Sequence, residues 1–102
     1  MSSVAGIDGQ GYLDILLGSE VRVDLMTLFH KNPGIMDTIE GLARRIGYLP
    51  EAIRNDLEAI LNLGVISKKK LGEHEIYSLN RARDDEVQSA IGDYLKNLKP
   101  QM

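Results

Sequence analysis

The stretch LARRIGYLPEAIRNDLEAILNLGVI, residues 42–66, decides how this chain folds. Gly47 supplies the permissive backbone of a sharp turn, and Pro50 favours the first position of a helix. From Pro50 onward, apolar residues recur every three or four positions until Gly64, a residue that commonly ends helices. The stretch therefore predicts a short helix, a tight turn and a second helix that begins at Pro50.

Upstream, the sequence predicts one further helix and the start of the short one. Ser19 can cap a helix over residues 20–30, and the run Asn32-Pro33-Gly34 stops it. Asp37, followed three residues later by Glu40, has the form of a capping box for the short helix. Three helices thus precede Gly64, and their apolar stripes predict a common core.

After Gly64 the spacing of apolar residues changes. The segments VISKKK (65–70) and HEIYSL (74–79) carry β-branched and aromatic residues, and LGE between them holds the glycine of a hairpin turn. Acidic residues at positions 84–86 and lysines near residue 99 suit the two ends of a last helix over 84–99. A β-hairpin and a terminal helix therefore follow the helical core.

These motifs resemble those of a known class of regulators. Residues 42–66 resemble the helix-turn-helix of winged-helix transcription regulators, and ISKKKLGEHEIYSL (66–79) resembles the wing. LLGSEVRVDLMTLF (16–29) is similar to the opening helix of ArsR-type and MarR-type regulators. The resemblance implies an α+β, mostly α, winged helix-turn-helix: a three-helix core plus a β-hairpin wing, with a C-terminal dimerisation helix. We expect a flexible N-terminal tail over 1–11, the winged domain over 12–83 and the last helix over 84–99.

The charge distribution decides whether a nucleic acid is a plausible partner. The 102-residue chain has a net charge of −3, which argues weakly against one. Residues 41–83, however, hold eight Lys or Arg and five Asp or Glu, a local charge of +3 that leaves −6 for the remainder. Because charges are screened within roughly 10 Å, a basic face can coexist with an acidic total. The charges are therefore compatible with double-stranded DNA, the partner that the resemblance to winged-helix regulators implies.

The helix after the turn carries the residues expected to contact bases. With the core positions removed, its outward face holds Tyr48, Glu51, Arg54 and Asn55 among others. Arg54 could pair with guanine, Asn55 with adenine, and Glu51 could accept a hydrogen bond from cytosine. The acids Asp56 and Glu58 would pair with Arg54 or face solvent. A solvated helix face without base contacts is the alternative for this segment.

Basic residues elsewhere are expected to contact phosphates. These are Lys68, Lys69 and Lys70 on the first strand of the hairpin, Arg44 and Arg45 on the short helix, and His74 near the turn. Adjacent residues on a strand alternate between two faces, so the three lysines cannot all point one way. The alternative is that they protect an exposed sheet edge from aggregation.

The last helix carries an apolar stripe that needs a cover. We expect Val87, Ile91, Tyr94, Leu95 and Leu98 to form a homodimer interface. The alternative is that the helix folds back on its own domain beside Leu13, Leu16 and Leu17. A second possible function also stays open, a winged helix that binds another protein instead of DNA.

The sequence does not indicate a metal site, an enzyme or a membrane protein. The chain has no cysteine and only two histidines, without a metal-ligand spacing, so we expect no metal, no cofactor and no enzyme. No segment has the length of a membrane span or the features of a signal peptide, so a cytoplasmic protein is expected. Many regulators of the resembled class respond to a small effector, but the cysteine ligands of the metal-sensing ArsR type are missing. The effector is unknown.

Overall fold

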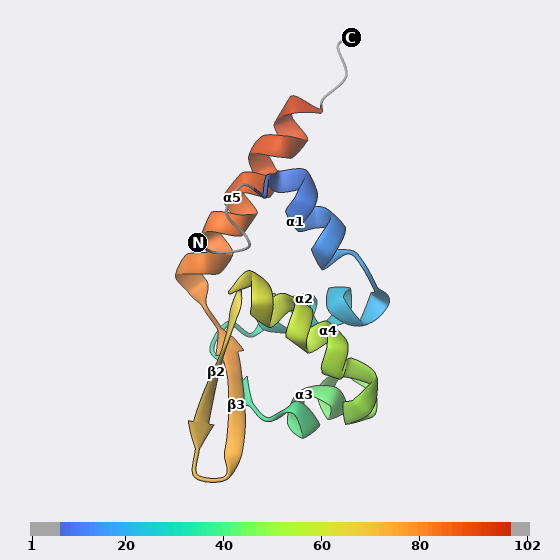
Figure 1. Ribbon diagram of the computed structural model, residues 1–102, viewed down its shortest axis with the longest axis vertical. Coiled ribbons are helices and arrows are strands. Elements are labelled where there is room, and N and C mark those ends of the chain that lie inside the picture. Colours follow the sequence, from blue (N-terminus) through green and yellow to red (C-terminus); the bar gives the residue numbers. More distant parts are fainter. Residues whose placement is uncertain (1–6, 99–102) are drawn as a thin grey trace.

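The computed structural model describes residues 7–98, and this part of the chain forms a winged helix with an added helix at each end. The elements are α1 (Gly9–Leu16), α2 (Glu20–Lys31), β1 (Met36–Asp37), α3 (Ile39–Ile46), α4 (Pro50–Leu63), β2 (Ile66–Leu71), β3 (His74–Leu79) and α5 (Arg81–Asn97). In Figure 1, α2, α3 and α4 cluster beside the β2–β3 hairpin, while α5 extends away from them with α1 alongside. The expected mostly helical α+β fold is confirmed. None of the helices in this range is both long and apolar enough to span a membrane.

The helix start at Ser19 agrees with the sequence prediction, whereas the start of α3 does not. Ser19 Oγ accepts the amide hydrogen of Arg22 at 3.1 Å. In α3, Thr38 is the N-cap and its Oγ1 accepts from the Gly41 amide at 3.1 Å. The expected capping box at Asp37 is therefore wrong, because Asp37 belongs to β1 and pairs with Tyr77 of β3.

The three strands form an antiparallel sheet in the order β1-β3-β2. Gly72, with φ +62°, makes the turn between β2 and β3 in the backbone region that glycine tolerates best. The hairpin is thus confirmed, and β2 is an edge strand. The short strand β1 was not expected, since two residues carry too little pattern to be recognised.

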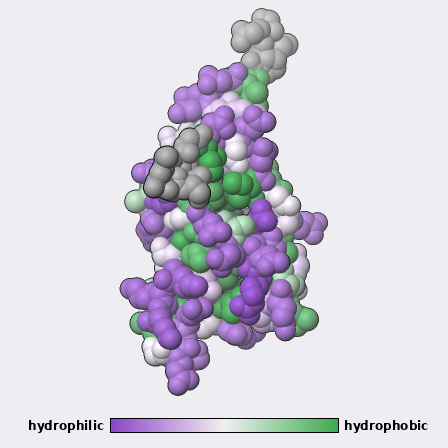
Figure 2. Space-filling model, in the orientation of Figure 1, coloured by the Kyte–Doolittle hydropathy of each residue, from purple (hydrophilic) through white to green (hydrophobic). Residues whose placement is uncertain are grey.

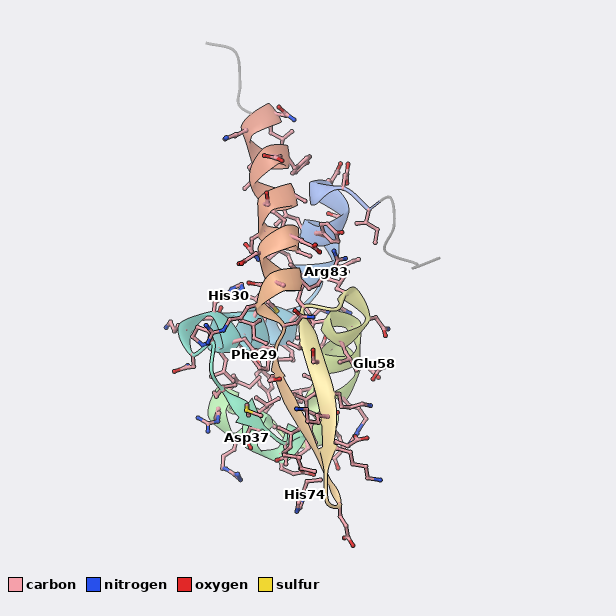
Figure 3. All side chains as sticks on the ribbon, turned by 90° about the vertical axis from the view of Figure 1, so that its left-hand side faces the viewer. Phe29, His30, Asp37, Glu58, His74 and Arg83 are labelled. Carbon is pink, nitrogen blue, oxygen red and sulfur yellow. The ribbon has the colours of Figure 1, made fainter. Side chains whose placement is uncertain are left out.

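A single apolar core joins the helices to the sheet. Its fully buried side chains include Phe29 and Leu25 of α2, Leu42 of α3, and Ile53 and Ile60 of α4. Figure 3 shows Phe29 in the interior, between the helices and the hairpin. One side of α4 packs into this core, and its opposite side is exposed to solvent.

The N-terminal glycines do not form the tail that we expected over residues 1–11. Residues 1–6 lie outside the described residues, but Gly9 and Gly11 belong to α1, whose N-cap Asp8 accepts from the Gly11 amide at 3.0 Å. A Cβ at Gly9 would collide with the Ala90 carbonyl oxygen and with Cβ of Tyr94. Glycine at position 9 therefore permits α1 to approach α5 closely, and the tail expectation is wrong for residues 9–11.

Helix α5 begins at Arg81, earlier than the expected residue 84, and its expected last residue, 99, lies outside the described part. It packs along α1. Val87 is fully buried in the folded chain and Ile91 is only 8% exposed. Leu95 and Leu98 are 51% and 55% exposed. The interface expectation is corrected at Val87, which the chain buries itself, and Ile91 is nearly buried. The fold-back alternative thus accounts for the first half of the stripe, and an uncovered half remains beyond it.

Candidate nucleic-acid interface

The turn between α3 and α4 is built to hold α4 away from its predecessor. Gly47 ends α3 in the left-handed conformation with φ +82°, and the Tyr48 amide donates to the Ala43 carbonyl at 2.9 Å. Pro50 then occupies the first turn of α4, where its missing amide hydrogen leaves no bond unmade. The N-terminal residues of α4 are therefore presented at the surface, as a helix that enters a DNA groove requires.

The exposed side of α4 holds the side chains expected to contact bases. Glu51, Arg54, Asn55 and Glu58 are all exposed, opposite the buried Ile53 and its helical neighbours. Arg54 and Asn55 are adjacent in sequence and offer several hydrogen-bond donors at one level of the helix. This face can make the two-bond contacts that distinguish purines in the major groove.

Asp56, one of the acidic residues of α4, is not part of that face. Its Oδ1 accepts from Arg22 Nε at 2.9 Å and from Ser19 Oγ at 2.7 Å. Arg22 in turn donates to the Ile15 carbonyl at 2.8 Å. Asp56 therefore joins α4 to the start of α2 and the end of α1, and it pairs with Arg22 instead of Arg54. The negative charge of α4 is partly neutralised inside the fold.

The pairing of β2 with β3 sorts the three lysines between the two faces of the sheet. Lys68 is opposite the buried Tyr77, and Lys70 is opposite Glu75. Since side chains alternate along a strand, these two lysines share the face that turns toward α4, and Lys69, opposite Ile76, lies on the other face. Lys68 Nζ lies 3.8 Å from Glu75 Oε2, a partly exposed pair with a small energetic effect.

A cleft of about 320 Å³ lies between α4 and the wing. Arg54 of α4, Lys70 of β2 and His74 of β3 all line it. Figure 3 shows His74 near the tip of the hairpin, and Figure 2 shows hydrophilic residues over the wing and the surface beside it. The structure thus brings together three of the predicted residues from separate elements. Acidic side chains, Glu40, Glu73 and Glu75, also line the cleft, so its charge is mixed.

Two of the predicted phosphate or base contacts are instead engaged with the protein. Arg45 Nε donates to Asp37 Oδ2 at 3.0 Å, and Tyr48 Oη donates to Asp24 Oδ2 at 3.0 Å. Figure 3 shows Asp37 on the opposite side of the molecule from Glu58 of α4. The structure therefore does not bring Arg45 to the α4 face. Arg44, in the last turn of α3, is exposed.

These two contacts also change proton affinities. Burial raises the pKa of the Asp37 carboxyl, but the hydrogen bonds from Arg45 and from the Thr38 amide, with the nearby arginine charges, lower it by more, so that the net pKa lies below the ordinary value. The hydrogen bond to Asp24 raises the pKa of Tyr48, and Tyr48 stays neutral at physiological pH.

Three contacts that the sequence did not indicate join α5 to α4, α1 and α2. Arg83 Nε donates to the Leu63 carbonyl at 2.9 Å and a second guanidinium nitrogen donates to Tyr12 Oη at 3.2 Å, so this arginine joins α4, α5 and α1. His30 Nε2 lies 3.0 Å from both carboxylate oxygens of the buried Asp84. All three contacts link residues distant in sequence, and no local signal could have revealed them. Among the described residues, no group of His, Asp or Glu could hold a metal ion.

Comparison with known proteins supports the fold. No protein-family model and no curated protein matches the chain. The chain is similar to the crystal structure of a possible transcriptional regulator for arsenical resistance, with a TM-score of 0.61 and 15% identity over 87% of this chain and 97% of that one. It is also similar to the solution NMR structure of the homodimeric winged helix-turn-helix DNA-binding domain of a possible ArsR-family regulator from Mycobacterium bovis, with a TM-score of 0.59 and 16% identity over 100% of this chain and 97% of that one. At these identities the likeness shows the fold, a winged helix-turn-helix.

Proposed function

We propose that this protein is a sequence-specific DNA-binding transcriptional regulator that places α4 in the major groove and the wing on the phosphate backbone. The observation that carries the proposal is the shared face of Arg54, Lys70 and His74, which lie on three elements around one cleft. A major groove about 12 Å wide accommodates one helix, and a neighbouring hairpin can then contact the backbone beside it.

The side chains have different roles in this arrangement. Arg54 and Asn55 contact bases, Glu51 accepts from a cytosine, and Lys68 and Lys70 neutralise phosphates. His74 and the exposed Arg44 supply further backbone contacts. Lys69 on the far face of the wing is excluded from this set, and Arg45 and Tyr48 hold the helix-turn-helix in shape through their bonds to Asp37 and Asp24.

The same proposal includes a homodimer. Leu17 and Val23 are 61% and 38% exposed, and they line an apolar groove of about 230 Å³ between α1, α2 and α5. Leu95 and Leu98 extend this apolar surface along α5. The similar Mycobacterium bovis domain is homodimeric, which supports a homodimer for this chain but does not itself indicate the surface.

A two-fold dimer would bind DNA more tightly than one chain, whose basic surface is small. It places two copies of α4 for successive major grooves, about 34 Å apart, and joins two modest interfaces into one tighter complex. In this arrangement α4 and the wing contact DNA, while α1 and the second half of α5 contribute the dimer contacts. No enzymatic activity and a cytoplasmic location belong to the same proposal.

Selection of bound duplexes from a random pool, followed by fluorescence anisotropy, tests the function. We expect a preferred site, and Arg54→Ala or Asn55→Ala should weaken binding to it by about 1 to 3 kcal/mol while leaving binding to a scrambled duplex unchanged. A pool with no enriched sequence and no duplex binding would reject the proposal in favour of a protein-binding winged helix.

A further inference from the structure

Leu49 is an apolar side chain whose presence the fold does not explain. It is 74% exposed and occupies the N-cap of α4, where it makes no side-chain hydrogen bond to the helix. Ser, Thr, Asp and Asn are preferred at this position because they satisfy an unpaired amide hydrogen of the first turn. A leucine here therefore contributes no cap and little buried surface to the folded chain.

The structure holds Leu49 firmly in spite of its exposure. On its N-terminal side, the Tyr48 amide donates to Ala43 and the Tyr48 hydroxyl donates to Asp24. On its C-terminal side, Pro50 restricts the backbone of the residue before it, and Leu49 adopts the extended conformation that this allows, with φ −79° and ψ 150°. The restrained backbone fixes where the Leu49 side chain begins, so a contact has to order only its side-chain torsions and not the loop as well.

The position of Leu49 separates it from the proposed dimer surface and joins it to the proposed DNA surface. The turn between α3 and α4 lies far from the end of α5 in Figure 1, so a dimer through α1 and α5 leaves it uncovered. Leu49 directly precedes the first turn of α4, the part of a recognition helix that contacts base edges. Its neighbours on that face, Glu51, Arg54 and Asn55, are polar or charged.

We infer that Leu49 is a base-reading residue that recognises thymine through its 5-methyl group. The inference rests on the proposed function and names one part of its specificity. The thymine methyl is the apolar group that a base pair presents in the major groove, and apolar side chains contact it there. The polar neighbours of Leu49 recognise hydrogen-bonding base edges, and Leu49 adds discrimination of thymine from cytosine.

Replacement of each thymine in the selected site by deoxyuridine tests the inference, because this exchange removes the methyl group alone. For the intact protein, we expect one position in each half-site at which affinity falls about three- to fivefold, the effect of losing one buried methyl contact. Leu49→Ser should bind the thymine site more weakly and lose the methyl dependence at that position. Leu71→Ser is the matched control: Leu71 is 51% exposed on the wing and is not part of the turn between α3 and α4, so this variant should keep the methyl dependence.

Thermal unfolding separates base reading from a structural role. Serine at the N-cap can accept an amide hydrogen bond, so Leu49→Ser should raise the Tm by about 2 to 6 °C while it weakens binding. A lower Tm would mean that leucine serves the fold and would overturn the inference. So would a methyl dependence that is absent from the intact protein or persists in Leu49→Ser. Absence of binding to any duplex would overturn the proposed function as well, which distinguishes the two failures.

Discussion

The two faces of the wing lead to a quantitative prediction for salt dependence. Lys68 and Lys70 share the face toward α4 and Lys69 lies on the other, although all three carry the same charge. Each phosphate contact contributes about 0.9 to the slope of log affinity against log salt concentration. In a dimer, Lys68→Ala combined with Lys70→Ala removes four contacts, so the slope should become shallower by about 3.6. Between about 50 and 200 mM salt, the intact protein should therefore lose roughly a hundredfold more affinity than the double variant.

Fluorescence anisotropy of the selected duplex and of a scrambled one, at a series of salt concentrations, measures these slopes. The change of about 3.6 in slope is an upper bound. Lys68 Nζ also lies 3.8 Å from Glu75 Oε2, so part of its charge is already neutralised within the protein. Lys69→Ala is the matched control and should leave the slope unchanged. Equal flattening by the single Lys69 variant, or no flattening by the double variant, would refute the assignment of the wing faces.

Three further predictions concern the fold, the assembly and the response to acid. Asp56→Ala should lower the free energy of unfolding by about 2 to 3 kcal/mol in urea denaturation, since it breaks two hydrogen bonds to a charged group, whereas Glu58→Ala on the exposed face should change it by less than about 0.5 kcal/mol; equal effects would contradict the role of Asp56. Leu95→Ser combined with Leu98→Ser should give a folded monomer by light scattering, and a persistent dimer would place the interface elsewhere. Because the pKa of Asp37 is lowered in the folded state, its stabilising effect is complete above the ordinary carboxyl pKa and is lost as the pH falls through the lowered value. Asp37→Asn should therefore reduce the loss of Tm below about pH 4, and an unchanged acid profile would argue against it.

The helix-turn-helix and the hairpin could be predicted because their signals are local. Gly47, Pro50 and Gly64 mark the limits of α4 within a few residues of one another, and the change from helical to alternating spacing marks the hairpin. The start of α3 could not be predicted in the same way. Asp37 is drawn into β1 by pairing with Tyr77, which is distant in sequence.

The candidate site was harder to predict than the fold, because it depends more on contacts between residues distant in sequence. The sequence indicated that the three lysines divide between two faces, but only the register with β3 assigns each lysine. The pairing of Asp56 with Arg22 and of Tyr48 with Asp24 joins helices that are far apart in the chain. Likewise, the glycines near the N-terminus indicated a loose tail until the close packing of α1 on α5 explained Gly9. The roles that the sequence did not predict correctly therefore belong to residues whose partners lie on another helix or strand.

A hydroxyl-radical footprint of the intact protein on the selected duplex tests whether two copies of α4 enter the DNA of one specific site. We expect two protected segments centred about one helical turn apart, 10 to 10.5 base pairs, with the same protection absent from a scrambled duplex. Arg54→Ala should remove both segments at a protein concentration that saturates the intact complex. Uniform cleavage of the selected duplex at concentrations where the protein is folded, or identical protection of the scrambled one, would show that α4 does not bind DNA in this way.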